Sequence, residues 1–168
     1  MEQDILFRTE NFIFSCRVAA ILIHDGKALL QRVEGDEEYA FIGGHVAYGE
    51  TTEETLVREF REELHADIEV KRLCAVGEIF FPWGEKPCHQ IGLFYRATLS
   101  GTPEIPLEGA FHGYDDFGRL RPGLEYSWVP LEDIRLKRAK LCLEELLPCM
   151  LEDTPEIRHF VSRQLENG

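Results

Sequence analysis

The sequence predicts an α/β domain in which a mixed sheet is packed between one central helix and further helices near the carboxyl end. Three observations support this expectation. The first half alternates between β-rich runs and turn residues, residues 52–64 have amphipathic helical spacing, and helical periodicity returns after residue 138. The length of 168 residues suggests one domain over residues 1–168, and 44% hydrophobic residues are enough for a core.

The composition limits the kinds of molecule that the protein is expected to bind. A net charge of −13 repels polyanions, so nucleic acid polymers and anionic membranes are poor partners, whereas a small phosphorylated ligand beside a local cation is possible. No run approaches 18 uncharged apolar residues, and the start MEQDILFRTEN has no basic region of a signal peptide. Five cysteines without a CxxC spacing indicate reduced thiols. We therefore expect a cytoplasmic protein.

The first strands are marked by turn residues. Residues 12–23 form a long run rich in Ile, Val and Phe that ends at the hairpin signal Asp25-Gly26. Residues 27–33 follow as the partner strand. Residues 39–46 are then expected to form a short strand that runs into glycines.

Residues 52–64 are expected to form the central helix. Thr51, followed three residues later by Glu54, makes a capping box at its start. Apolar side chains at helical spacing would pack on the sheet; they are Leu56, Val57, Phe60 and Leu64.

Beyond the helix, residues 66–81 and 89–99 are expected to be strands separated by a proline-containing loop. Residues 101–123 would form a long surface loop or a lid, and residues 124–131 a last short strand. Residues 138–151 have helical periodicity with a break at Pro148, and residues 155–165 suit a terminal helix. Apolar residues near Leu141–Leu151 offer a surface for a possible homodimer.

Three glutamates share one face of the central helix. Glu59, Glu62 and Glu63 stand at i, i+3 and i+4, and like charges at these spacings each cost about 0.2–0.5 kcal/mol. They should sit at the rim of the core, beside the apolar stripe. Hard divalent cations prefer carboxylate and phosphate oxygens, so a metal that bridges them to a pyrophosphate would turn this repulsion into a site.

The spacing around these acids resembles the Nudix box. Residues 44–66 read GHVAYGETTEETLVREFREELHA and match Gly-x5-Glu-x7-Arg-Glu-U-x-Glu-Glu-x-Gly-U, where U is a bulky aliphatic residue. Every charged position agrees. His65 stands where the family has the glycine that ends the helix in a left-handed conformation, and Ala66 where it has a larger aliphatic residue.

The resemblance implies a Nudix-like α/β/α sandwich with the box helix beside the cleft. It implies metal ligands at Gly44, Glu59, Glu62 and Glu63, with one glutamate possibly acting as base. Glu50 and Arg58 would hold the loop and the helix together. The implied metal is Mg²⁺, with Mn²⁺ possible.

Residues outside the box are weaker candidates. Glu125 or Glu108 would supply the additional glutamate that many Nudix hydrolases use, and Pro82 resembles a proline of ADP-ribose-cleaving relatives. Aromatic residues near it, Phe80, Phe81 and Trp83, would stack on a base or pack in the core. His45 follows Gly44 and would contact phosphate or be inert. No role is assigned to His89, His112, His159, Asp115 or Asp116.

The expected activity is Mg²⁺-dependent hydrolysis of a pyrophosphate bond in a nucleoside diphosphate derivative. An ADP-ribose-like small-molecule substrate ranks first, because the downstream segments resemble a branch of the family named for ADP-ribose pyrophosphatase. Two alternatives remain open, a MutT-like nucleoside triphosphate pyrophosphohydrolase and a Nudix-like nucleotide-sensing module without catalysis.

Overall fold

A computed structural model describes residues 3–165. Within that range, strands and helices follow one another as β1 (Leu6–Arg8), β2 (Ile13–His24), β3 (Lys27–Val33), β4 (Glu38–Phe41), β5 (Gly43–His45), α1 (Thr52–Leu64), β6 (Ile68–Trp83), β7 (Lys86–Leu99), β8 (Ala110–Tyr114), β9 (Leu120–Pro130), α2 (Leu131–Arg135), β10 (Lys140–Leu141), a 3-10 turn (Glu144–Leu146), α3 (Leu147–Leu151) and β11 (Arg158–Arg163).

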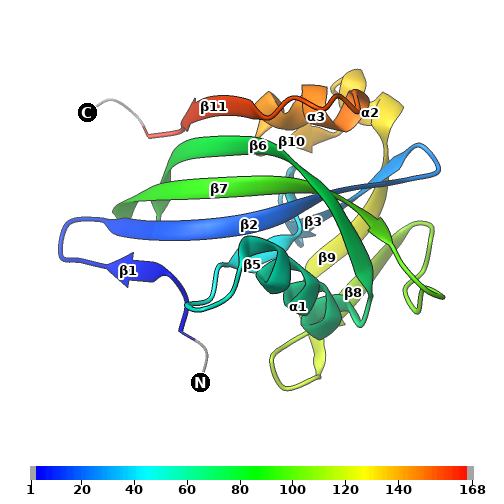
Figure 1. The fold of residues 1–168 in the computed structure, drawn as a ribbon, viewed down its shortest axis with the longest axis horizontal. Helices are drawn as coiled ribbons and strands as arrows, with labels where there is room; N and C mark the ends of the chain where they lie inside the picture. Colours follow the sequence, from blue (N-terminus) through cyan, green and yellow to red (C-terminus); the bar gives the residue numbers. More distant parts are fainter. Residues whose placement is uncertain (1–2, 166–168) are drawn as a thin grey trace.

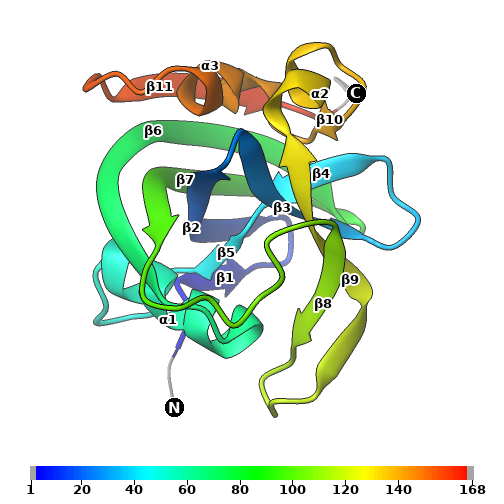
Figure 2. The same ribbon diagram turned by 90° about the vertical axis from the view of Figure 1, so that its right-hand side faces the viewer.

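The strands form a strongly curved mixed sheet whose main path runs β10-β4-β3-β2-β7-β6-β11 (Figure 1). β2 and β7 are parallel at its centre, and β6 pairs with β7 in an antiparallel hairpin. Helix α1 covers one face, while α2, α3 and β11 lie on the opposite side (Figure 2). The α/β fold that the sequence predicts is therefore confirmed.

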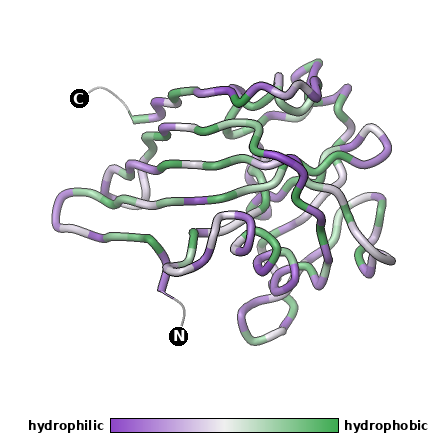
Figure 3. The backbone as a smooth tube through the Cα atoms, viewed as in Figure 1, coloured by the Kyte–Doolittle hydropathy of each residue, from purple (hydrophilic) through white to green (hydrophobic). Residues whose placement is uncertain are grey.

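Two hydrophobic cores lie between the sheet and the segments that cover its two faces. Alternation along β2 sends Val18, Ala20 and Leu22 into the core beneath α1, whereas Ala19 and Ile21 enter the second core beneath α2 and α3. The central strands are mostly hydrophobic along their length, and the connecting turns are mostly hydrophilic (Figure 3). This double burial explains why the sequence of β2 is almost continuously apolar.

Helix α1 has the start that the sequence predicts. The side-chain hydroxyl of Thr51 accepts a hydrogen bond from the Glu54 backbone N–H, and the Glu54 carboxylate accepts one from the Thr51 backbone N–H. At the other end His65 is left-handed, with φ 52° and ψ 34°, and its backbone N–H donates to the carbonyl of Arg61. A histidine thus ends the helix in the conformation that glycine usually supplies.

Several expected strand boundaries are wrong. Residues 39–46 are interrupted at Ile42, because β4 pairs with β3 whereas β5 pairs with β2. The expected loop over residues 82–88 shrinks to the two-residue turn Gly84-Glu85, since Pro82 and Pro87 still pair in register at the hairpin end. Residues 101–123 contain β8 and the start of β9 and are not one long loop or lid.

The expected carboxyl-terminal helices are also wrong. Residues 138–151 contain β10, a 3-10 turn and the five-residue α3, which has Pro148 in its first turn, where the missing N–H costs nothing. Residues 158–163 form β11, which runs parallel to β6. Phe160 on β11 packs over Gly77, where a Cβ atom would lie 2.4 Å from its ring. Sheet pairing therefore overrides the helical propensity of this segment.

Several apolar residues of the stretch expected to offer a dimer surface are buried within the protein. The apolar side chains of Leu141, Leu146 and Met150 are at most 5% exposed and belong to the second core. The five cysteines are free thiols. In the described part of the chain, no helix is long and apolar enough to cross a membrane.

Candidate active site

An ion pair between Arg58 and Glu50 holds the loop that precedes helix α1, here called the box loop, against the helix. The Nε and Nη2 atoms of Arg58 donate to the two carboxylate oxygens of Glu50 at 2.9 and 3.2 Å. The Thr55 hydroxyl also donates to Glu50. Since both oxygens are engaged by one guanidinium, the loop that precedes the helix has a fixed orientation relative to it.

The three acids of α1 differ in exposure. The side chains of Glu59 and Glu63 are only 16% and 18% exposed, whereas that of Glu62 is 50% exposed. Arg58 Nη1 donates to Glu59 at 3.3 Å and to Glu62 at 3.1 Å. Glu63 instead accepts a hydrogen bond from the hydroxyl of Tyr126 at 3.2 Å.

Burial and mutual repulsion shift the pKa values of the two inner acids. Desolvation, together with the charge of Glu63, raises the pKa of Glu59 to about 7. Desolvation also raises the pKa of Glu63, against the opposing effects of Tyr126 and Arg121. The nearby arginines therefore compensate only in part for the burial of the two carboxylates.

Gly44 on β5 lies directly against Glu59. A Cβ atom at position 44 would lie 2.5 Å from both Cδ and Oε1 of Glu59, so only glycine leaves room for the carboxylate beside the backbone of the box loop. The carboxylates of the box offer oxygen ligands, which suit Mg²⁺ or Mn²⁺.

The acidic residues of the box thus fit a divalent cation by their chemistry. Among residues 3–165, no three His, Cys, Asp or Glu side chains converge on one point as they stand. Glu59 and Glu62 both accept hydrogen bonds from Arg58, so binding a cation requires their carboxylates to turn from this arginine.

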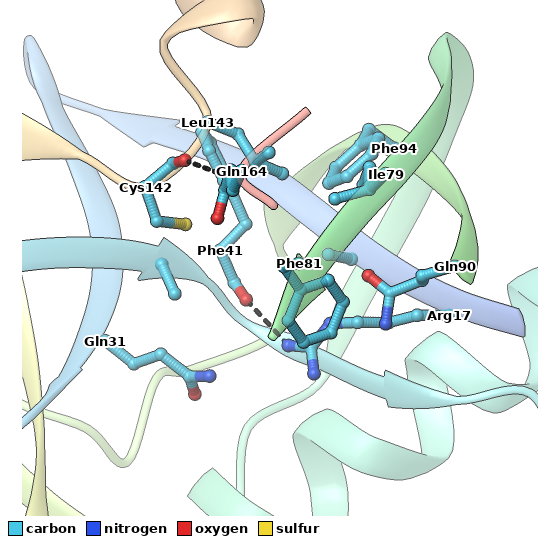
Figure 4. A pocket seen from close by; sticks show the side chains of 12 residues that line it. Arg17, Gln31, Phe41, Ile79, Phe81, Gln90, Phe94, Cys142, Leu143 and Gln164 are labelled. Atoms are coloured by element: carbon cyan, nitrogen blue, oxygen red, sulfur yellow. Dashed lines mark hydrogen bonds between the residues drawn. The ribbon is translucent and has the colours of Figure 1, made fainter. Parts of the chain in front are cut away.

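A cavity of about 240 Å³ opens between the central sheet and the segment after β10 (Figure 4). Apolar side chains, including Phe41, Phe81 and Phe94, form most of its wall. Three carboxamides also line it, those of Gln31, Gln90 and Gln164. The Oε1 atom of Gln31 is buried and has no hydrogen-bond partner within the described residues. The cavity is thus mostly apolar with a few polar groups, as small-molecule sites are.

Arg17 connects this cavity to the acids, and the sequence did not identify it. Its Nη2 atom donates to the carbonyl of Phe41 at 3.0 Å, and its side chain lies at the cavity wall (Figure 4). Burial lowers the pKa of Arg17, whereas the nearby charges of Glu63 and Glu59 raise it. The signal available in the sequence was Arg17 itself, a positively charged residue within the apolar run of β2. An arginine placed there needs a partner when the strand is buried.

The β8–β9 hairpin contributes two further residues that the sequence did not identify. Tyr126 is fully buried and donates to Glu63, and Arg121 Nη1 lies 3.9 Å from Glu63 Oε1. The sequence predicted a loop over residues 101–123, so the contact between Arg121 and Glu63 was not expected. In the structure β9 begins at Leu120 and includes Arg121.

The aromatic candidates of the β6–β7 hairpin lie on two different faces of the hairpin. Phe81 lines the cavity. Trp83 stacks on His45 with ring centroids 5.6 Å apart, so it supports the box loop from outside the cavity. Phe80 points to the other face and stacks on His89, with centroids 4.4 Å apart.

The structure does not bring the two extra glutamates to the box. Glu125 pairs with Arg32, Nη2 to Oε1 3.2 Å, and lines a separate depression with Tyr39 and Asp133. Its neighbour Tyr126 faces Glu63, and successive strand residues point to opposite faces. Glu108 is exposed between β7 and β8.

The remaining candidates have structural partners. Asp115 accepts hydrogen bonds from the backbone N–H groups of Phe117 and Arg119 at the hairpin tip. His112 Nδ1 lies 3.1 Å from the carbonyl of Leu124, and His159 pairs with Glu78 at 2.8 Å. Pro82 lies near the end of the β6–β7 hairpin.

Comparison with known proteins finds the same fold in several solved structures. Similar structures include an ADP-ribose pyrophosphatase from Streptococcus suis (17% identity, TM-score 0.57, 86% of this chain and 98% of the other covered) and a MutT NUDIX hydrolase from Burkholderia pseudomallei (19%, 0.55, 83% and 98%). A MutT protein from Methanosarcina mazei Go1 is similar at 20% identity and TM-score 0.56, with 85% and 96% covered.

At such identities these structures show a shared fold. The family assignment rests on the NUDIX domain profile, which matches residues 15–148. That range contains the whole box and most of the central sheet. The chain therefore belongs to the NUDIX domain family and has the complete charged set of a Nudix hydrolase box.

Proposed function

We propose that this Nudix hydrolase cleaves the pyrophosphate bond of a nucleoside diphosphate derivative in the presence of Mg²⁺ or Mn²⁺. One observation carries the proposal: Arg17 forms part of the cavity wall, and its strand β2 pairs with β5, on which Gly44 lies against the box acid Glu59. A ligand with a nucleoside in the cavity would therefore present its phosphates to both Arg17 and the acids.

The roles of the side chains follow from their charges and positions. A bound divalent cation would supply charge neutralisation at the phosphates and lower the pKa of water. Arg58 and Glu50 hold the acid-bearing helix against the box loop, and Arg17 would donate to phosphate oxygens. We assign Glu59 first as base, because its carboxylate lies against the box loop at Gly44.

Several features of the cavity support a nucleoside. Aromatic rings such as Phe81 offer a stacking surface, and stacking on a base contributes about 1–3 kcal/mol in single-strand binders. The unpaired Oε1 of Gln31 is an acceptor for an exocyclic amino group, which adenine carries. We therefore rank an ADP-ribose-like substrate first, and the Streptococcus suis protein of the same fold is an ADP-ribose pyrophosphatase.

A nucleoside triphosphate is the second candidate substrate class, because MutT proteins share the fold. The small-molecule nucleotide is the partner that we propose. Five free thiols are suited to a reducing compartment, which favours the cytoplasm.

The deciding experiment measures hydrolysis of ADP-ribose, NADH, sugar nucleotides and nucleoside triphosphates with Mg²⁺ and with Mn²⁺. We expect AMP and ribose 5-phosphate from ADP-ribose as the preferred reaction. Release of pyrophosphate from a triphosphate, with ADP-ribose untouched, would favour the MutT-like alternative. If nothing is cleaved while a nucleotide raises the melting temperature, the protein is a sensing module.

A further inference from the structure

We infer that Arg121 binds the distal phosphate of the substrate, meaning the phosphate farther from the nucleoside, and that it pairs with Glu63 until metal and substrate arrive. The inference rests on the proposed function. It starts from the 3.9 Å separation between Arg121 Nη1 and Glu63 Oε1, which places a cation from the β8–β9 hairpin beside the box acids.

The hairpin that carries Arg121 is fixed on the end of helix α1. Gly113 on β8 lies against the helix so closely that a Cβ atom would be 2.4 Å from the carbonyl oxygen of Glu63. Tyr114 stacks on His65, with ring centroids 3.8 Å apart and an interplanar angle of 10°. Because both contacts involve residues at the helix end, the hairpin has one position relative to the acids.

The backbone around Arg121 is restricted as well. Pro122 follows Arg121 and disfavours helical conformations at that residue, so Arg121 stays extended. The arginine side chain is 49% exposed, whereas Glu63 is 18% exposed. The guanidinium can therefore contact both the buried acid and a ligand that comes from solvent.

The ion pair between Arg121 and Glu63 is suited to being replaced by contacts with a cation and a phosphate. At 3.9 Å it is an ion pair without a short hydrogen bond, and half-exposed pairs of this kind are weak. A divalent cation bound at Glu63 would repel the guanidinium from this carboxylate by its positive charge. The guanidinium then presents its planar donors to a phosphate oxygen, which is the geometry that arginine binds best.

Two arginines from different elements thus lie beside the box. Arg121 comes from β9 and pairs with Glu63. Arg17 lies at the cavity wall on β2, next to β5, on which Gly44 lies against Glu59. The phosphate next to the nucleoside would meet Arg17, and the distal phosphate would meet Arg121.

The experiment compares Arg121→Gln and Arg121→Lys with the wild type by isothermal titration calorimetry. The probes are Mn²⁺ alone, and methylene diphosphonate, a non-hydrolysable pyrophosphate mimic, in excess Mg²⁺. Arg119→Gln is the matched control, since Arg119 lies on the same hairpin but pairs with Asp115 at 3.0 Å.

We expect Arg121→Gln to weaken methylene diphosphonate binding about tenfold and Arg121→Lys to weaken it less. Mn²⁺ alone should bind Arg121→Gln as tightly as the wild type or more tightly, because a competing cation has been removed. A role in folding alone would not strengthen metal binding. Arg119→Gln should leave both affinities unchanged.

Unchanged diphosphonate binding in Arg121→Gln would overturn the assignment of Arg121, and so would a parallel loss of Mn²⁺ affinity. Failure of the wild type to bind the diphosphonate would overturn it too. None of these results by itself refutes the proposed hydrolysis, which the substrate panel decides independently. Conversely, an inactive wild type that still shows the Arg121 effects would refute only the proposed function.

Discussion

His65 stacks on Tyr114 at the point where helix α1 ends, with ring centroids 3.8 Å apart. His65 has φ 52°, a conformation that costs most non-glycine residues about 1–2 kcal/mol. The stack offers a physical reason for a histidine at the box position where glycine is usual. The ring contact stabilises the helix end and joins the β8–β9 hairpin to the box helix.

Replacing His65 tests this relationship. We expect His65→Val to lower the free energy of unfolding by about 2 kcal/mol, because a β-branched residue is strained at positive φ and the ring contact is lost. His65→Gly should change it by less than about 1 kcal/mol, since relief of strain offsets the lost stack. Urea denaturation measures both. Equal stability of His65→Val and wild type would contradict the left-handed helix end.

Gly44→Ala is expected to impair activity without unfolding the protein. The new Cβ atom would take the position of the Glu59 carboxylate, and a displacement of about 1 Å at a reacting centre can cost about 100-fold in rate. We expect kcat/KM to fall at least about tenfold and the urea midpoint to change little.

The double variant Gly44→Ala/Glu59→Gln serves as the control for that result. If Gly44→Ala acts through Glu59, adding it to Glu59→Gln should cost little further activity. Fully additive losses would show that Gly44 acts by another route.

The raised pKa of Glu59 predicts a pH dependence of stability in metal-free protein. A carboxyl with a pKa of about 7 in the fold and about 4.3 when unfolded binds more protons in the folded state between these values. Stability should therefore be full below about pH 4 and fall as pH rises to about 7, by about 1–3 kcal/mol from this group.

Denaturation of Glu59→Gln over the same pH range checks this expectation. The variant should lose less stability than the wild type between about pH 4.5 and 7, since glutamine does not titrate. Saturating Mg²⁺ should also reduce the decline, because a cation favours the ionised carboxylates. Identical pH profiles for variant and wild type would contradict the shifted pKa.

Phe81 and Phe80 form a matched pair for the cavity. Phe81→Ala should raise KM for the nucleotide about tenfold, because Phe81 lines the cavity and its loss removes about 1–3 kcal/mol of stacking. Phe80→Ala removes the same side chain from the opposite face, where it contacts His89, and should leave KM unchanged. Steady-state kinetics decide, and similar KM values in both variants would argue against the cavity as the nucleoside site.

The box and helix α1 could be predicted because their signals are local. Thr51 and Glu54 cap the helix through contacts only three residues apart, and the glutamates gather at i, i+3 and i+4. Long apolar runs likewise predicted β2 and most of β6 and β7. The division of residues 39–46 into β4 and β5 was not predicted. The chain changes its pairing partner from β3 to β2 at Ile42, and the local sequence gives no sign of this change.

Contacts between distant segments could not be predicted. Phe160 packs over Gly77, and this pairing turns residues 158–163 into a strand although their sequence also suits a helix. Tyr126 and Arg121 reach Glu63 only because Gly113 lets the β8–β9 hairpin approach α1. Glu125 was a reasonable candidate by residue type, but strand alternation turns it toward Arg32.

The most direct test of the box as a catalytic metal site is hydrolysis of the preferred nucleotide at increasing Mg²⁺ in wild type, Glu63→Gln and Glu53→Gln. Both variants lose one carboxylate of α1, but Glu53 is exposed in the first turn of the helix. We predict that Glu63→Gln loses at least about 100-fold in kcat while retaining its urea midpoint, and that Glu53→Gln matches the wild type. Turnover of Glu63→Gln at a near wild-type rate would contradict the account.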